Sequence, residues 1–257
     1  MFGYFKIQNH NNKTLRGRLI PPQQDKPLVV FVHGLGGGMF EPQYRALQKS
    51  LTQEGFGVCK FDMVNGLGAS SKDIHNLSVQ DYYQDLLSVL TYITSQGYSD
   101  LVLVGHSLGG GLVLKLLESD TTYTSVVVGA VLINPYCSAL GTTFEDVQTM
   151  IDKIPYRMKR WYHSLELTRE FVTKMNQFDT ILGAENITTP LFLIHGAHDR
   201  TIPEVQSREL RKKLTCPVVF KVYENFGHAF MRPQARKHLP ELCNDITLWI
   251  KAIKEKK

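Results

Sequence analysis

Short runs of consecutive apolar residues alternate along the chain with longer segments in which apolar residues recur every three or four positions. The run Leu28–Val32 is apolar throughout, and residues 101–104 and 191–194 follow the same pattern. Such runs are typical of parallel strands that are covered on both faces. Because segments of helical periodicity separate them, the sequence predicts an α/β protein with a doubly wound, mostly parallel sheet.

The other predicted elements extend this alternation. Strands are predicted at residues 57–62, 126–133 and 218–223, and helices at residues 42–54, 78–96, 109–118 and from about Pro240 onward. Ser78 and Asp81 have the spacing of a capping box at the start of one helix. Two further strands, at residues 2–8 and 14–20, have no helix between them, so we expect an antiparallel edge there.

Residues 136–184 interrupt the alternation, because they contain no convincing buried strand. Charged and large apolar residues are mixed in two segments, at residues 143–163 and 167–182, whose pattern favours helices. We interpret this region as a helical lid, inserted into a core that residues 1–135 and 185–257 form. A pair of ordinary crossover helices is the alternative interpretation.

Composition narrows the class of protein. The chain has 257 residues, of which 43% are hydrophobic and 21% charged, as in ordinary globular proteins. The net charge is +5, but no basic stripe with interleaved aromatic residues stands out, so we expect no nucleic-acid partner. No segment approaches the ~18 apolar residues of a membrane span, and the start of the chain lacks a signal-peptide pattern. We therefore expect a cytoplasmic protein without membrane insertion. Whether two copies of the chain form a homodimer stays open.

Cysteine usage agrees with a reducing compartment. Cys59, Cys137, Cys216 and Cys243 are scattered and form no C-x-x-C pair. This distribution favours buried thiols over a disulfide framework or a zinc site. We expect neither a metal nor a cofactor.

The strongest chemical signal is a G-x-S-x-G motif centred on Ser107. The motif directly follows the apolar run at residues 101–104 and precedes a helical pattern. In this context the small residues allow a tight strand-to-helix turn that lifts the serine hydroxyl above the edge of the sheet. Ser107 is therefore the predicted nucleophile, and the side chain of His106 should point away from it. A glycine-rich turn without a catalytic role is the alternative.

The sequence resembles the α/β-hydrolase superfamily over nearly its whole length. Within the superfamily it is most similar to small bacterial carboxylesterases of the cinnamoyl (feruloyl) esterase and monoacylglycerol-lipase-like groups. Four segments carry the resemblance: His33-Gly34-Leu35-Gly36-Gly37, Gly105-His106-Ser107-Leu108-Gly109-Gly110, His195-Gly196-Ala197-His198-Asp199 and Asn225-Phe226-Gly227-His228. The resemblance implies an α/β-hydrolase fold and a serine-dependent hydrolase.

A serine hydroxyl needs a base, because it is a weak nucleophile at neutral pH. Nine histidines compete for this role. His228 lies five residues after the predicted strand at residues 218–223, and the catalytic histidine of the resembled family occupies such a loop. We predict His228 as the base, whereas His33 and His195 are expected to pack or to form hydrogen bonds at the ends of their strands.

The base needs an acid that fixes its tautomer and stabilises its charged form. Asp199 lies just past the predicted strand at residues 191–194, which places it at the same edge of the sheet as Ser107. The order Ser, Asp, His also agrees with this fold. We predict that Asp199 orients His228.

Two alternatives to this assignment stay open. Asp62 also ends a predicted strand and is the second candidate for the acid. His195, His198 and Asp199 lie close together in the sequence and would be ligands if the segment bound a metal.

Two backbone N–H groups should stabilise the oxyanion of the tetrahedral intermediate. Leu108, directly after the nucleophile, supplies one of them. The resemblance implies that Leu35 supplies the other, with Gly36 as the alternative.

These residues predict a serine hydrolase that cleaves carboxylic esters through an acyl-enzyme on Ser107. The expected partner is a small-molecule ester with an apolar or aryl acyl group that is held under the lid. Cleavage of a thioester, an amide or a carbon–carbon bond stays open for the same triad, as does acyl transfer. A non-catalytic ligand-binding relative is the remaining alternative.

Overall fold

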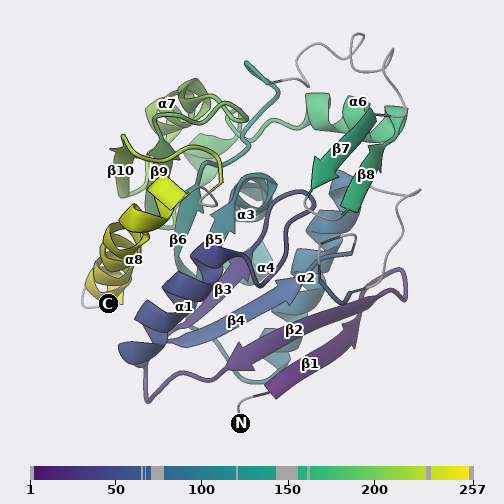
Figure 1. The fold of residues 1–257 in the computed structure, drawn as a ribbon. Helices are drawn as coiled ribbons and strands as arrows, with labels where there is room; N and C mark the ends of the chain where they lie inside the picture. Colours follow the sequence, from purple (N-terminus) through teal and green to yellow (C-terminus); the bar gives the residue numbers. More distant parts are fainter. Residues whose placement is uncertain are drawn as a thin grey trace.

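The structure is a computed structural model that describes residues 3–64, 66, 68–70, 78–119, 121–142, 156–160, 163–229 and 233–254. An eight-stranded sheet runs through its centre in the order β1-β2-β4-β3-β5-β6-β9-β10 (Figure 1). All neighbouring strands from β4 to β10 are parallel. The predicted doubly wound, mostly parallel sheet is therefore confirmed.

The central strands coincide with the apolar runs and are almost completely buried. They are β3 (Leu28–Val32), β4 (Gly57–Asp62), β5 (Leu101–His106), β6 (Val127–Ile133) and β9 (Leu191–Gly196). Strand β10 (Val218–Tyr223) forms one edge of the sheet. At the other edge, β1 (Gly3–Gln8) and β2 (Thr14–Ile20) pair in antiparallel fashion, as expected from the missing helix between them.

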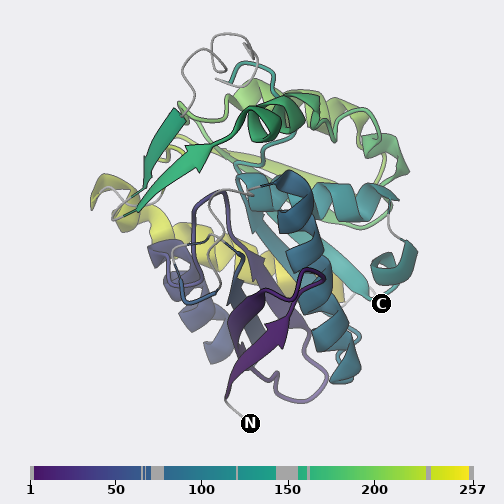
Figure 2. The same ribbon diagram turned by 90° about the vertical axis from the view of Figure 1, so that its right-hand side faces the viewer.

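Helices cover both faces of the sheet (Figures 1 and 2). On one face, α1 (Pro42–Gln53) and α8 (Pro233–Lys254) contribute Leu47 and Ile246 to a core cluster that includes Val104. On the other face, α2 (Val79–Ser95) and α3 (Leu108–Ser119) pack against Leu103 and its neighbours. Three shorter helical elements lie between the strands and helices already named: α4 (Thr121–Thr124), η1 (Ala184–Asn186) and α7 (Glu204–Lys213).

Two helix starts test the sequence predictions. The Ser78 Oγ accepts a hydrogen bond from the Asp81 backbone N–H at 3.1 Å, as the capping pattern predicts. The last helix, however, begins at Pro233, and Pro240 lies inside it, so the predicted start near Pro240 is wrong. Both prolines suit a first helical turn, but the buried stripe reaches back to Leu239, one residue before Pro240, and the helix continues through the second proline to keep this stripe on the core.

The predicted lid is only partly helical. Residues 143–155 lie outside the described residues. β7 (Tyr156–Arg160) and β8 (His163–Leu167) form an antiparallel two-stranded sheet. The helix predicted at residues 143–163 is therefore wrong from residue 156 onward, where the chain forms a strand. Hydrogen bonds between two short segments stabilise this hairpin, and helical periodicity does not reveal them. The second predicted helix is present as α6 (Arg169–Gln177), and Phe171 and Met175 anchor it in the core.

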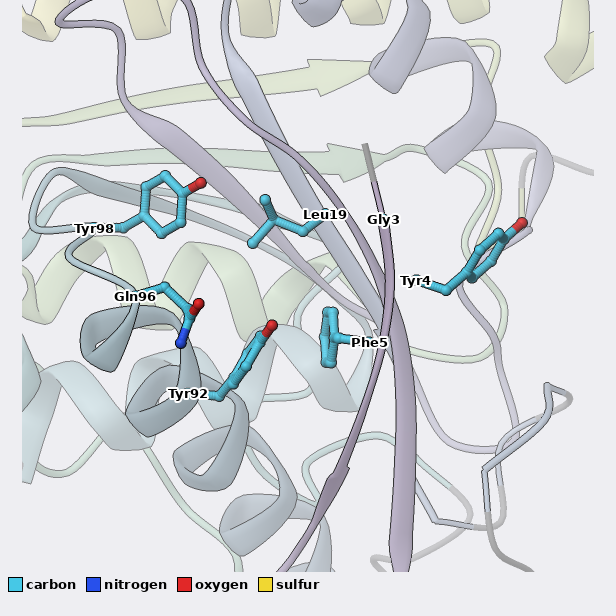
Figure 3. Close-up of a pocket in the computed structure, with 7 residues that line it drawn as sticks. All are labelled: Gly3, Tyr4, Phe5, Leu19, Tyr92, Gln96 and Tyr98. Carbon is cyan, nitrogen blue, oxygen red and sulfur yellow. The ribbon is translucent and has the colours of Figure 1, made fainter. Parts of the chain in front are cut away.

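A cavity of about 270 Å³ lies between β1 and the C-terminal end of α2 (Figure 3). The ring of Phe5 stacks on Tyr92 in its wall, with ring centroids 4.8 Å apart. Tyr98, which also lines the cavity, precedes β5, whereas Ser107 follows the end of that strand. The cavity therefore lies near the amino-terminal ends of the parallel strands, whereas the predicted nucleophile lies at their carboxyl-terminal ends. Among the helices in the described part of the chain, none is long and apolar enough to cross a membrane.

Candidate active site

Ser107 is the single residue between the end of β5 and the start of α3. Its φ of 56° lies in the left-handed region, which residues other than glycine rarely adopt. The flanking glycines make this turn sterically feasible. A Cβ at Gly105 would lie 2.6 Å from the Gly109 carbonyl oxygen, and a Cβ at Gly109 would lie 2.2 Å from the Val32 carbonyl oxygen. The strained turn that the motif predicts is present, and strain of this kind is typical of functional sites.

Three predicted site residues from distant parts of the chain form one hydrogen-bonded series. The His228 Nδ1 lies 2.7 Å from the Asp199 Oδ2, and the His228 Nε2 lies 3.0 Å from the Ser107 Oγ. An ionised carboxylate can only accept, so Nδ1 carries the proton and Nε2 is free to accept from the serine hydroxyl. Ser107 and His228 are both buried, at 7% and 9% exposure, which strengthens these interactions by excluding water.

Asp199 is held ionised by its surroundings. Its Oδ1 accepts hydrogen bonds from the backbone N–H groups of Thr201 at 2.8 Å and Ile202 at 2.9 Å. Burial alone would raise the pKa of the Asp199 carboxyl, but the hydrogen bond and charge of His228 and the two backbone bonds outweigh it and lower this pKa below its ordinary value. Asp199 is thus an anion that can stabilise a positive charge on His228.

Two further side chains, which were not predicted as site residues, fix the loop that carries His228. The His106 Nε2 donates to the His228 carbonyl oxygen at 2.8 Å. The Asn134 Nδ2 donates to the carbonyl oxygens of Gly227 at 3.1 Å and His228 at 3.2 Å. The Asn134 Oδ1 accepts from the Gly196 N–H at 2.8 Å, so this one residue links the ends of β6 and β9 to the histidine loop. Its position directly after an apolar strand is the signal in the sequence.

The glycine-rich loop after β3 packs directly on the nucleophile. A Cβ at Gly34 would lie 2.9 Å from the Ser107 Cβ and 3.3 Å from its Oγ. In the part of the chain that the structure describes, neither the Leu35 N–H nor the Leu108 N–H donates to a backbone carbonyl. Leu108 directly follows the serine and Leu35 directly follows Gly34, so both N–H groups stay candidates for the oxyanion site.

The alternative residues have other partners. The Asp62 Oδ1 accepts from the Met39 N–H at 2.8 Å and its Oδ2 from the Ala69 N–H at 3.1 Å, so this carboxylate links two loops and does not contact His228. The His33 Nε2 accepts from the Met63 N–H at 2.9 Å. Both histidines that end strands form hydrogen bonds there, as expected, since the His195 ring contacts the Ser207 Oγ at 2.7 Å and the Ile202 carbonyl oxygen at 3.0 Å.

A metal site at His195, His198 and Asp199 does not fit these contacts. Both ring nitrogens of His195 are occupied, and His198 is exposed. Among the residues with a described placement, no group of three or more His, Cys, Asp or Glu side chains is arranged to hold a metal ion. All four cysteines are free thiols.

Comparisons of the whole chain with known proteins find similar hydrolases. Residues 23–178 match the family described as "Serine aminopeptidase, S33", and residues 171–250 match the dienelactone hydrolase family. A carboxylesterase of Bacillus subtilis is 24% identical over 225 residues, which cover 81% of this chain and 87% of that protein. The mitochondrial palmitoyl-protein thioesterase ABHD10 of Mus musculus is 22% identical over 240 residues, which cover 91% of this chain and 77% of that protein.

Solved structures share the fold. The mouse alpha/beta hydrolase domain-containing protein 10 superposes with a TM-score of 0.80 at 17% identity, covering 98% of this chain and 99% of that one. Est1E from Butyrivibrio proteoclasticus, with ferulic acid bound, gives a TM-score of 0.76 at 19% identity, covering 96% of this chain and 99% of that one.

Proposed function

The chain belongs to the "Serine aminopeptidase, S33" family of α/β hydrolases, and on that premise we propose that it hydrolyses carboxylic esters through an acyl-enzyme on Ser107. The observation that carries the proposal is the series Ser107–His228–Asp199, with contacts of 3.0 Å and 2.7 Å. The name of the Bacillus subtilis carboxylesterase supports an ester as the substrate, and so does the name of a structurally similar esterase from Exiguobacterium antarcticum.

The proposed reaction uses these contacts in turn. His228 Nε2 removes the proton of the Ser107 hydroxyl as the oxygen attacks the ester carbonyl carbon. The charge that develops on the imidazole is stabilised by Asp199, which stays ionised. The N–H groups of Leu35 and Leu108 stabilise the oxyanion, and the alcohol leaves with the proton from His228. Water then attacks the acyl-enzyme with His228 again as the base, and the carboxylic acid is released.

The region from residue 136 to residue 184 is proposed as a lid that provides an apolar environment for the acyl or aryl group. It joins the core close to the nucleophile, because the Tyr136 N–H donates to the Ser107 carbonyl oxygen at 2.9 Å. The Gln206 side chain fixes the start of this region by accepting from the Cys137 N–H at 3.0 Å and donating to the Leu140 carbonyl oxygen at 2.7 Å. A small-molecule ester would therefore meet the lid and the nucleophile together.

Thioester cleavage is the second candidate, because a relative that shares 22% identity over 91% of this chain is named a palmitoyl-protein thioesterase. Ester and thioester cleavage would use the same triad and oxyanion donors. The two differ in the leaving group, so relative kcat/KM values for matched acyl esters and thioesters separate them.

The test is a panel of p-nitrophenyl esters from short to long acyl chains, with thioester and anilide analogues. Ser107→Ala should lower kcat by about 10³-fold or more on every substrate that the wild type cleaves. Ser99→Ala removes a hydroxyl at an exposed position before β5 and serves as the matched control. Full activity in Ser107→Ala, with Ser99→Ala unchanged, would rule out the acyl-enzyme on Ser107.

A further inference from the structure

The outer face of the antiparallel edge carries a row of polar and aromatic side chains. Successive residues of a strand point to opposite faces, and Phe5 and Phe61 belong to the core cluster that contains α2. Their neighbours Tyr4 and Lys60 therefore point away from α2, and Figure 3 shows Tyr4 on the opposite side of β1 from Phe5. Tyr4 pairs with Arg18, and Arg18 pairs with Lys60, so the three residues lie side by side across β1, β2 and β4.

Three cations and one exposed ring meet at the end of this row, and we call Arg18, Phe40, Arg45 and Lys60 the Lys60 cluster. The Lys60 Nζ lies 4.9 Å from the centroid of the Phe40 ring, and the Arg45 Cζ lies 5.6 Å from the same centroid. The Phe40 side chain is 40% exposed although two cations flank it. In Figure 1, α1 lies over β3 and β4, whereas no helix covers β1 and β2 on that side.

Lys60 is the unusual member of the cluster. It is only 2% exposed, and within the described ranges the one contact recorded for its ammonium group is the ring of Phe40. Burial, and then the charges of Arg18 and Arg45, lower the pKa of Lys60 to about 8. A buried ammonium without an anionic partner is costly, so such groups are normally paired.

Asp62 is the acidic residue whose charge acts on Lys60, but it is not the missing anionic partner. Asp62 favours the charged form of Lys60, but its Oδ1 and Oδ2 accept from the backbone N–H groups of Met39 and Ala69. Arg18 and Arg45 likewise form no ion pair in the part of the chain that is described. The cluster therefore combines three positive charges with one carboxylate, which also accepts hydrogen bonds from two backbone N–H groups.

We propose that the Lys60 cluster binds a phosphate group, at a site separate from Ser107. Two guanidinium groups and one ammonium group offer many N–H donors in several directions, which suits the oxygens of a tetrahedral dianion better than the two oxygens of a carboxylate. The phosphate is that of a soluble phosphate compound or of a phospholipid headgroup, since both present the same chemistry. The proposal does not depend on ester hydrolysis.

The first experiment titrates inorganic phosphate into the full-length protein and follows binding by calorimetry and by the thermal midpoint, with sodium chloride at matched ionic strength as the reference. Lys60→Met should weaken phosphate binding by about tenfold or more, as expected for the loss of a buried charge partner. Lys49→Met removes an equal charge from an exposed position one turn after Arg45 on α1. The affinity of this variant for phosphate should stay within about twofold of the wild-type value.

Arg18→Gln, at a half-buried position, should also weaken binding and keeps the test informative if Lys60→Met does not fold. Equal losses in Lys60→Met and Lys49→Met, or equal effects of phosphate and chloride on the wild type, would overturn the proposal, because they would indicate general screening of a basic surface.

A second experiment separates the two sources of phosphate. Sedimentation with phosphatidylglycerol vesicles, compared with phosphatidylcholine vesicles, measures headgroup binding. Binding to the anionic vesicles that Lys60→Met abolishes and free phosphate displaces supports a headgroup as the ligand. Phosphate binding without vesicle binding supports a soluble compound. Vesicle binding that is the same in Lys60→Met and Lys49→Met contradicts a specific site.

Discussion

The side-chain amide of Asn134 donates to the main-chain carbonyl of His228 at 3.2 Å, and thereby connects the end of a central strand to the proposed base. The same carbonyl accepts from the His106 Nε2 at 2.8 Å, next to the proposed nucleophile. These bonds fix the backbone from which the imidazole projects. We therefore expect Asn134 to act as a positioning residue whose removal changes catalysis more than binding.

Substitution of Asn134 tests this role. Asn134 has a φ of 46°, so alanine adds backbone strain at this position whereas glycine does not. Asn134→Gly and Asn134→Ala should both lower kcat by about 10–100-fold with little change in KM, since both lose the bonds to the histidine loop. Only Asn134→Ala should show the added loss of stability from strain in chemical denaturation. A kcat in Asn134→Gly that equals the wild-type value would show that the loop does not need this residue.

The close approach of Gly34 to Ser107 gives a steric prediction. A Cβ at residue 34 would lie 2.9 Å from the Ser107 Cβ, whereas a Cβ at Gly3 would have nothing within 4 Å. Gly34→Ala should displace either the serine or the loop with Leu35, and kcat should fall by about 10²-fold or more. Gly3→Ala is the matched control and should keep wild-type kcat. Steady-state kinetics on one p-nitrophenyl ester suffice, and equal activity of the two variants would contradict an oxyanion site at this loop.

Asp199→Asn tests the acid. The amide can still accept from Thr201 and Ile202, but its NH₂ group would face His228 Nδ1 and favour the tautomer in which Nε2 carries the proton. That tautomer cannot accept the proton of Ser107, so kcat should fall by about 10³–10⁴-fold. Asp179→Asn alters an exposed carboxylate that likewise caps two backbone N–H groups, and it should leave kcat unchanged.

Asp199→Asn should also change how strongly the stability of the protein depends on pH under acidic conditions. The pKa of Asp199 is lowered in the folded protein from an ordinary value of 3.8, so the ionised group stabilises the fold above that pH and the stabilisation is lost as pH falls through the folded-state pKa. In denaturant titrations at a series of pH values, the wild type should lose more stability than Asp199→Asn below about pH 4. Parallel curves for the two proteins would contradict a paired, ionised Asp199.

Asp85 should give the free energy of unfolding the opposite dependence on pH. Burial raises the pKa of this carboxyl to about 6, although Asn9 and the Val64 N–H donate to it. The folded state therefore binds the proton more tightly than the unfolded state, and the free energy of unfolding should fall by roughly 2–3 kcal/mol as pH rises from about 4 to about 6.

Asp85→Asn should remove this slope, whereas Asp25→Asn, at an exposed loop position, should keep it. Urea titrations across this pH range measure the difference between the variants. If Asp85→Asn retains the wild-type slope, another group is responsible for the pH dependence.

Most of the fold follows from local patterns. The continuous apolar runs predict the buried parallel strands because both faces of those strands are covered, and the gap without a helix predicts the antiparallel pairing of β1 and β2. Helix α7 was not predicted, because its sequence is mostly polar and its buried positions include Gln206 and Ser207. The hairpin of β7 and β8 depends on pairing between two segments, which the helical pattern of each segment alone conceals.

The residues of the site likewise divide into those that the sequence predicts and those that it does not. The sequence predicts Ser107, Asp199 and His228 as site residues because motif, strand end and chain order point to the carboxyl ends of the parallel strands, and the structure brings the three into contact. Asn134 and His106 act through hydrogen bonds to a backbone carbonyl that lies 94 and 122 residues away in the sequence. Such contacts depend on how loops meet in space, so the sequence shows that Asn134 directly follows an apolar strand but not which loop it contacts.

The most direct test of the central claim is labelling of the wild-type protein with a fluorophosphonate, followed by peptide mass spectrometry. The expected result is one adduct on Ser107 that is formed at least about 10²-fold more slowly in His228→Ala, because the serine then lacks its base. His198→Ala removes an exposed histidine near the site and should react as fast as the wild type. A folded wild-type protein that forms no adduct, or an adduct on another serine, would contradict the assignment of Ser107 as the nucleophile.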